Sequence, residues 1–143
     1  MIRLDEINED NWRLPLEVAE NQKTFVAPPA SILARAYAYR HSRSMAYVIY
    51  ADDTPVGMAM YHDCDPLDAF DFSQFFIDAR YQRKGYGRTA VRAILELMKA
   101  DGKYQKVVLC YIEGNDAARR LYESFGFRET DRDGNEIIME LTF

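Results

Sequence analysis

The stretch DARYQRKGYGRTAVRAIL at positions 78–95 constrains the fold of this chain more than any other part of its sequence. It joins an aromatic run with the character of a central strand, FDFSQFFID, to an amphipathic run. In that second run Val91, Ile94, Leu95 and Met98 recur at the spacing of one helix face. A strand that passes into a helix through a glycine-rich turn favours a layered α/β or α+β fold.

The turn itself has the chemistry of an anion site. The first amides of a helix have no partners within it and lie at the positive end of its dipole. Gly85 and Gly87 allow a ligand to approach the backbone closely, and Arg83, Lys84 and Arg88 add positive charge. The dinucleotide fingerprint needs a third glycine and the NTPase phosphate loop needs a G-K-[ST] ending, and both are missing. The alternative is a plain loop with a glycine bend and solvated charges.

The other elements predict a mixed sheet of six to seven strands with about four helices on its faces. MIRLDEI predicts an edge strand, and MAYVIYADDTPVGMAMYH predicts two strands around the turn Asp52–Pro55. KVVLCYI predicts a buried strand, and the last two strands flank Asp133–Gly134. The helix after the glycine turn should end at Gly102, and NDAARRLYESFGF predicts a later helix that Asn115 caps and Gly126 stops.

Two helices are expected before the first hairpin. Asp10 is placed to cap one of them, in which Trp12, Leu16 and Ala19 have a helix-like spacing. Ser31 is placed to cap the next, which should run to position 39.

Composition bounds the class of protein. The 143 residues predict one domain over positions 1–143, and a 48% hydrophobic share is enough to fill a core. A net charge of −5 argues against a nucleic-acid partner. No secretion leader and no apolar run of about 18 residues are visible, so no membrane partner is expected. Cys64 and Cys110 are interpreted as free thiols of a cytoplasmic protein, and His62 beside Cys64 lacks the further ligands of a metal site, so no metal is expected.

Two motifs carry a resemblance to a known family. Gln82 to Gly87, QRKGYG, resembles the Q/R-x-x-G-x-G/A signature for acetyl-CoA in the GNAT superfamily of N-acetyltransferases. NDAARRLYESFGF resembles the later N-x-x-A-x-x-x-Y-x-x-x-G-F motif of the same superfamily. The order of elements also resembles the GNAT fold from end to end. The resemblance implies an acyltransferase that uses acetyl-CoA as co-substrate and passes the acetyl group directly to an amine in a ternary complex.

The resemblance also implies where the co-substrate lies. The pyrophosphate would rest on the amides of the glycine turn, and the pantetheine arm would pair like an extra strand with the strand before it. That pairing requires this strand to splay from KVVLCYI. The implied cofactor-binding residues are Phe75, Phe76, Ile77, Gln82, Arg83, Lys84, Gly85, Tyr86, Gly87, Arg88, Asn115 and Ala118.

Acyl transfer needs a donor for the leaving thiolate and an acceptor for the proton of the attacking ammonium. By resemblance the phenol of Tyr122 serves the leaving sulfur; the alternative is a core tyrosine. Ser73 stands where polyamine acetyltransferases tend to have a carboxylate. Asp71 lies on the same strand face and is the preferred base, with Glu113 as second choice. Proton loss through ordered water, with no single base, stays open.

The acceptor is expected to be a small-molecule amine, and a polyamine or diamine in particular. The pattern L-x-V-x-x-x-Q-x-x-F-V-A and the stretch FFIDARYQRKGYG are similar to bacterial spermine/spermidine acetyltransferases. Acidic side chains would attract such a cation, and the candidates are Glu17, Glu20, Asp63, Asp65 and Asp68. The alternatives are a peptide N-terminus, a protein lysine, an amino sugar or a drug, or a CoA-binding domain without catalysis. A homodimer is a further expectation from the resemblance.

Overall fold

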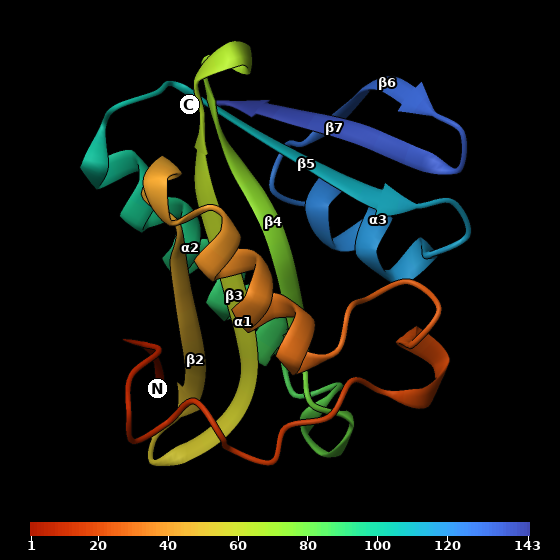
Figure 1. Ribbon diagram of the computed structural model, residues 1–143. Coiled ribbons are helices and arrows are strands. Elements are labelled where there is room, and N and C mark those ends of the chain that lie inside the picture. Colours follow the sequence, from red (N-terminus) through yellow and green to blue (C-terminus); the bar gives the residue numbers. More distant parts are fainter.

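The computed structural model describes residues 1–143 and contains one mixed sheet of seven strands in the order β1-β2-β3-β4-β5-β7-β6 (Figure 1). Neighbouring strands are antiparallel except β4 and β5, which are parallel. The strands are β1 Ile2–Glu6, β2 Met45–Ala51, β3 Thr54–Cys64, β4 Ala69–Ile77, β5 Lys106–Ile112, β6 Arg128–Asp133 and β7 Glu136–Thr142. The predicted mixed sheet and its central aromatic strand are confirmed.

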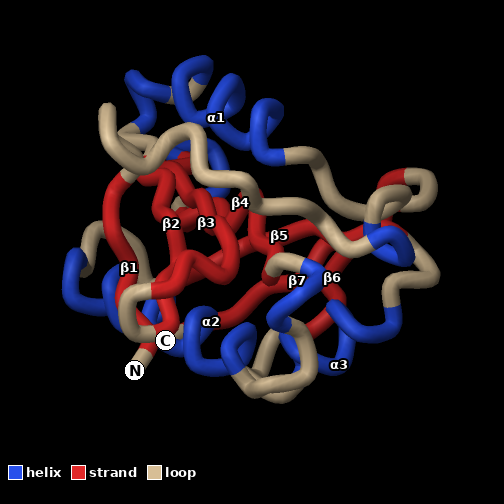
Figure 2. The backbone as a smooth tube through the Cα atoms, turned by 90° about the horizontal axis from the view of Figure 1, so that it is seen from below, coloured by secondary structure: helices blue, strands red, loops and turns tan.

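Helices cover both faces of the sheet, with α1 on one face and α2 and α3 on the other (Figure 2). The larger core lies under α2 and α3, and a smaller apolar cluster lies under α1. The α-helices are α1 Pro29–Ala38, α2 Tyr86–Asp101 and α3 Asp116–Glu123, and short 3-10 turns occupy Glu20–Gln22, Arg40–Ser42, Asp65–Leu67 and Ala79–Tyr81. No helix is both long and apolar enough to cross a membrane.

The helix expected after Asp10 does not form, so the structure has three α-helices and not about four. Leu16 and Val18 are both buried with the exposed Glu17 between them, and this alternation is typical of an extended segment and not of a helix. The segment is held extended by contacts with the end of β4: the Glu17 N–H donates to Asp78 Oδ2 at 2.8 Å, and Arg80 donates to the Pro15 carbonyl at 3.1 Å. Tertiary hydrogen bonds therefore override the local helical spacing.

The cap predicted for the second helix is also wrong. Helix α1 begins at Pro29 with Pro28 as its N-cap, because a proline in the first turn loses no helical hydrogen bond. Ser31 lies inside that first turn. The caps predicted for the later helices are confirmed: Gly102 ends α2 with a positive φ, and the Asn115 side chain accepts from the Ala118 N–H at the start of α3.

Candidate active site

Strands β4 and β5 separate soon after they meet. They pair only at Phe70 with Val107 and at Asp71 with Val108, and beyond Asp71 the strand β4 has no partner on its β5 side. Figure 1 shows the two strands diverging toward the glycine turn, with α3 beside the opening. A cavity of about 710 Å³ occupies this region. The splay that a strand-like ligand would require is present, and β4 residues Phe75 to Ile77 line it.

The glycine turn forms one end of this cavity. Arg83 and Gly85 both have positive φ, 63° and 80°, so successive backbone amides turn toward one side. The N–H groups of residues 83–88 donate to no acceptor in the chain. A Cβ built on Gly85 would meet nothing within 4 Å. The turn therefore offers free amides and open space at the N-terminus of α2, which is the arrangement that binds an anion.

The expected cofactor residues do not all face this cavity. Those that line it are Phe75, Phe76, Ile77, Gln82, Arg83, Gly85, Tyr86, Gly87, Asn115 and Ala118. Lys84 is exposed outside it. The Arg88 side chain turns away to donate to Ser124 Oγ at 2.7 Å, with its guanidinium 5.1 Å from the centre of the Phe125 ring. The side chains of Lys84 and Arg88 therefore form no part of the cavity wall.

Strand β4 contains a β-bulge where it passes along the cavity. Phe72 pairs with Tyr61 and Gln74 pairs with Met60, so Ser73 is an extra residue on β4. Before the bulge Phe70 and Phe72 face the larger core, whereas Phe76 after it belongs to the cluster under α1. Asp71 and Ser73 both line the cavity, as do the β4 residues between and after them.

The Asp71 carboxylate lies at the point where the strands part. Its side chain is 28% exposed, and Oδ2 is 3.7 Å from Nε2 of His62. Burial raises the pKa of Asp71, and the positive charges of His62 and Arg35 act in the opposite direction. Arg35 reaches the same region from α1 and donates to the Ser73 hydroxyl. Asp71 is thus a partly buried carboxylate with a raised pKa that faces a cavity, which are the properties of a candidate base.

Tyr122 faces the cavity from α3. Its ring packs edge-on against Phe72 and Phe127, at centroid distances of 6.1 and 5.8 Å. Burial raises the pKa of its hydroxyl well above the usual range. The phenol is therefore held by its ring and keeps its proton, while its hydroxyl has no hydrogen-bond partner within the chain.

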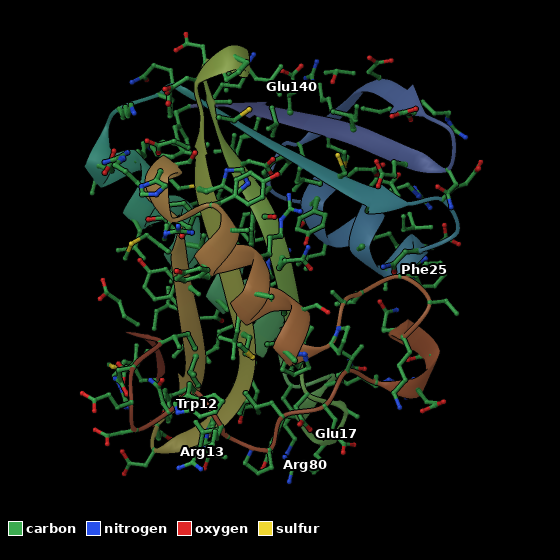
Figure 3. The ribbon with its side chains drawn as sticks, viewed as in Figure 1. Trp12, Arg13, Glu17, Phe25, Arg80 and Glu140 are labelled. Atoms are coloured by element: carbon green, nitrogen blue, oxygen red, sulfur yellow. The ribbon has the colours of Figure 1, made fainter.

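The N-terminal segment closes the cavity near α3. Gln22 and Asn115 exchange side-chain hydrogen bonds, with Asn115 Nδ2 3.1 Å from Gln22 Oε1. Phe25, which lines the cavity, lies at the lower end of α3 (Figure 3). Both residues stand in the pattern L-x-V-x-x-x-Q-x-x-F-V-A, where the sequence analysis gave neither of them a role.

Glu113, the second choice for the base, does not line the cavity. Its carboxylate pairs with Arg132 Nη1 at 2.9 Å on the surface. Glu113 was predicted as a base because it directly follows β5. Its partner Arg132 comes from β6, and the local sequence does not indicate this pairing.

The predicted acceptor residues Asp63, Asp65 and Asp68 lie before β4, at the opposite end of that strand from the glycine turn. None of their three carboxylates lines the cavity. Asp63 has a side chain only 6% exposed, and it binds both Arg43 and Lys103 at 2.7 Å. Asp65 accepts from the Tyr104 hydroxyl, and Asp68 is exposed in the turn. This geometry does not support the predicted acceptor role, because Asp63 and Asp65 are paired within the fold and Asp68 lies outside the cavity wall.

The carboxylates of Glu17 and Glu20 are also absent from the cavity wall. The helix that was to present them does not form. Glu17 lies beside Arg80 below the glycine turn (Figure 3), and Glu20 pairs with Lys23 at 2.8 Å on the surface. Their assignment to the acceptor is therefore corrected as well.

Several cavity residues had no role in the sequence analysis. The charged or reactive ones among them are Arg35, Cys110, Arg120 and Glu136. Arg35 has no carboxylate within ion-pair distance. Its guanidinium donates to the Ser73 hydroxyl and lies 4.7 Å from the centre of the Tyr39 ring. Asp71 and Glu136 are the carboxylates of the wall, and both raise the pKa of the Cys110 thiol after the larger effect of burial. These four side chains come from separate elements, so only the folded chain brings them together.

Comparison with known proteins gives a consistent result. Residues 4–127 match the model of the Acetyltransferase (GNAT) family. A spermine/spermidine N(1)-acetyltransferase of Bacillus subtilis is 28% identical over 150 residues, which cover 97% of each chain.

Solved structures show the same fold. A spermidine N-acetyltransferase from Vibrio cholerae, in complex with CoA and spermine, superposes with a TM-score of 0.77 at 18% identity, covering 99% of this chain and 95% of that one. The ribosomal-protein-S18-alanine N-acetyltransferase of Escherichia coli gives a TM-score of 0.75 at 21% identity, covering 99% and 94%.

Proposed function

The chain belongs to the acetyltransferase (GNAT) family and is an N-acetyltransferase, and from this premise we propose that it moves the acetyl group of acetyl-CoA to a primary amine of a polyamine or diamine. Spermidine and spermine are the first acceptors to test. The observation that carries the proposal is the opening between β4 and β5, which brings Asp71, Tyr122 and the free amides of the glycine turn to one cavity.

The donor end of the cavity fits a pyrophosphate followed by an extended arm. Free amides at residues 83–88 and the positive end of α2 suit the phosphates. Arg120, exposed at the cavity wall, adds a cation. Beyond Asp71 the unpaired side of β4 suits main-chain pairing with the pantetheine amides. Acetyl-CoA supplies the thioester that is cleaved.

The reaction needs one residue that accepts a proton and one residue that donates a proton. A primary alkyl ammonium has a pKa near ~10, so at neutral pH it must lose a proton before it attacks. Asp71 holds this ammonium and accepts its proton at the point where the strands part. Tyr122 keeps its proton until the sulfur leaves, and then donates it. The nitrogen loses its second proton as the amide forms, and that proton restores the phenol. The proton acceptor, on β4, and the proton donor, on α3, therefore come from different elements of one cavity.

The acceptor class is supported by the B. subtilis relative, whose name states spermine and spermidine, and by the carboxylates Asp71 and Glu136 in the cavity wall. A specific observation favours a second candidate, the α-amine of a peptide. Arg35 is a cation without a carboxylate partner, and it lies near Asp71. Such a cation repels a multiply charged polyamine and suits an amine that carries an anionic group nearby.

A panel of acceptors distinguishes the two candidates. Purified protein and acetyl-CoA are mixed with spermidine, spermine, a diamine, a peptide with a free N-terminus and an amino sugar, while thiol release and product mass are recorded. The proposal expects the highest kcat/KM for spermidine or spermine, with one acetyl group on a primary amine. Turnover of the peptide or the sugar without polyamine turnover would reject the polyamine and leave the acetyltransferase assignment standing.

Replacement of Gly85 by valine should weaken CoA binding at least tenfold, or about 1.4 kcal/mol. A β-branched side chain is strained at a φ of 80°, and its atoms would occupy the open space above the amides. Isothermal calorimetry with CoA measures the change.

Gly102→Val is the matched control. Gly102 has nearly the same backbone conformation, with φ 76° and ψ 3° against φ 80° and ψ 3° for Gly85, but it lies at the far end of α2. Both variants should lose comparable folding stability, and only Gly85→Val should lose affinity. Equal CoA affinity of the two folded variants would contradict the placement of the pyrophosphate at the turn.

A further inference from the structure

His62 lies on β3 directly opposite Asp71 on β4. The residue is only 3% exposed, and its Nε2 atom is buried without a hydrogen-bond partner. The nearest charged group to Nε2 is the Asp71 carboxylate, with Oδ2 at 3.7 Å. A buried polar nitrogen without a partner is uncommon in folded proteins, and this one points at the candidate base.

The other ring nitrogen fixes where the protons are. Nδ1 is 2.7 Å from the carbonyl oxygen of Asp63, and a carbonyl oxygen only accepts hydrogen bonds, so Nδ1 carries a hydrogen. The ring is held in place by a stack on Tyr39, with centroids 4.2 Å apart and planes at 16°. In neutral His62 the Nε2 lone pair would thus face a carboxylate, whereas in the imidazolium an N–H would face it.

The surroundings contain few other charges. Besides His62, the charge that acts on Asp71 is Arg35 from α1, and the Cys110 thiol on β5 lies close enough to be affected by Asp71 and by Glu136 of β7. Around His62 lie the Tyr39 ring and Asp63, whose own charge is bound by Arg43 and Lys103. Burial opposes the ionised form of Asp71, and the cations His62 and Arg35 favour it.

We propose that His62 is a positioning residue for Asp71, whose buried imidazole faces the carboxylate through Nε2, orients it and favours its ionised form. The inference rests on the proposed function, in which Asp71 must be charged both to hold the ammonium and to accept its proton.

The test compares the pH profiles of kcat for wild type, His62→Gln and His41→Gln. Glutamine keeps a polar side chain but cannot carry the charge. In His62→Gln the acid limb should move to higher pH by about one unit or more, because the buried carboxylate loses its cation, and the profiles should converge at high pH. A merely structural role would lower kcat at every pH without moving the limb, and a superimposable limb in folded His62→Gln would overturn the inference. His41→Gln, an exposed histidine of the turn Arg40–Ser42, should keep the wild-type limb.

A second measurement does not depend on activity. The chain has two histidines, so His41→Gln leaves His62 as the single histidine for ¹⁵N NMR. At high pH the ring should show the Nδ1–H tautomer, and its Nε2 shift should change when Asp71→Asn is added. An Nε2–H tautomer, or an Nε2 shift that ignores Asp71→Asn, would overturn the inference. If wild type acetylates no amine, the proposed function fails, and NMR alone then decides the His62–Asp71 pairing.

Discussion

Tyr122→Phe should lower kcat by about 10²–10⁴-fold while leaving the fold and CoA affinity close to wild type. The ring of Tyr122 is held by Phe72 and Phe127, and phenylalanine keeps both contacts. The hydroxyl makes no hydrogen bond within the chain, so its removal leaves no buried partner unsatisfied. What is lost is the proton for the leaving sulfur. Steady-state kinetics with thiol detection, together with CoA calorimetry, measure the two parts of this result.

The pH dependence of wild type provides a further check on Tyr122. The phenol must be protonated to act as a donor, and burial raises its pKa above the ordinary value. No loss of activity from ionisation of Tyr122 should therefore appear below about pH 10. Tyr61→Phe is a suitable control, since Tyr61 is a buried tyrosine that does not line the cavity. Wild-type turnover in Tyr122→Phe would make Tyr122 a core residue only.

The parts of the fold that were predicted correctly depend on local signals. Gly85 and Gly102, both with positive φ, cap the two ends of α2. The apolar residues between them, which include Val91 and Ile94, lie on one helix face. Residues close in sequence make these contacts, so a single sequence contains the information. The splay of β4 from β5 is different, because only the resemblance to a family implied it.

The errors share a physical cause, which is contact between distant residues. Asp63 was assigned to the acceptor because its neighbours are acidic, but Arg43 and Lys103 approach it from other elements. The segment after Asp10 has helical spacing, yet Asp78 holds it extended. Likewise the bulge at Ser73 and the pairing of His62 with Asp71 depend on strand register, which turn residues and periodicity do not specify to one residue.

Asp71→Asn should reduce kcat by about 10²–10⁴-fold near neutral pH and recover part of the loss as the pH rises toward that of the free amine. Asparagine has the shape of the acid but accepts no proton, so turnover then depends on the fraction of acceptor that is already neutral. In wild type, Asp71 must be ionised to act. Because burial raises its pKa, activity should fall with decreasing pH at a higher pH than an exposed aspartate would give, and this acid limb should be missing in Asp71→Asn.

Stability should change in the opposite direction from activity. Between the ordinary pKa of an aspartate and the raised pKa of Asp71, the folded state binds a proton that the unfolded chain has released, so ionisation of Asp71 lowers stability as the pH rises through this window. Asp71→Asn removes this titration, so the decline of stability with rising pH through this window should be weaker in the variant. Glu113→Gln is the matched control: Glu113 pairs with Arg132 outside the cavity, so this variant should retain kcat. Full activity of Asp71→Asn at neutral pH would instead assign proton removal to water, and a loss of activity in Glu113→Gln would make Glu113 the candidate base.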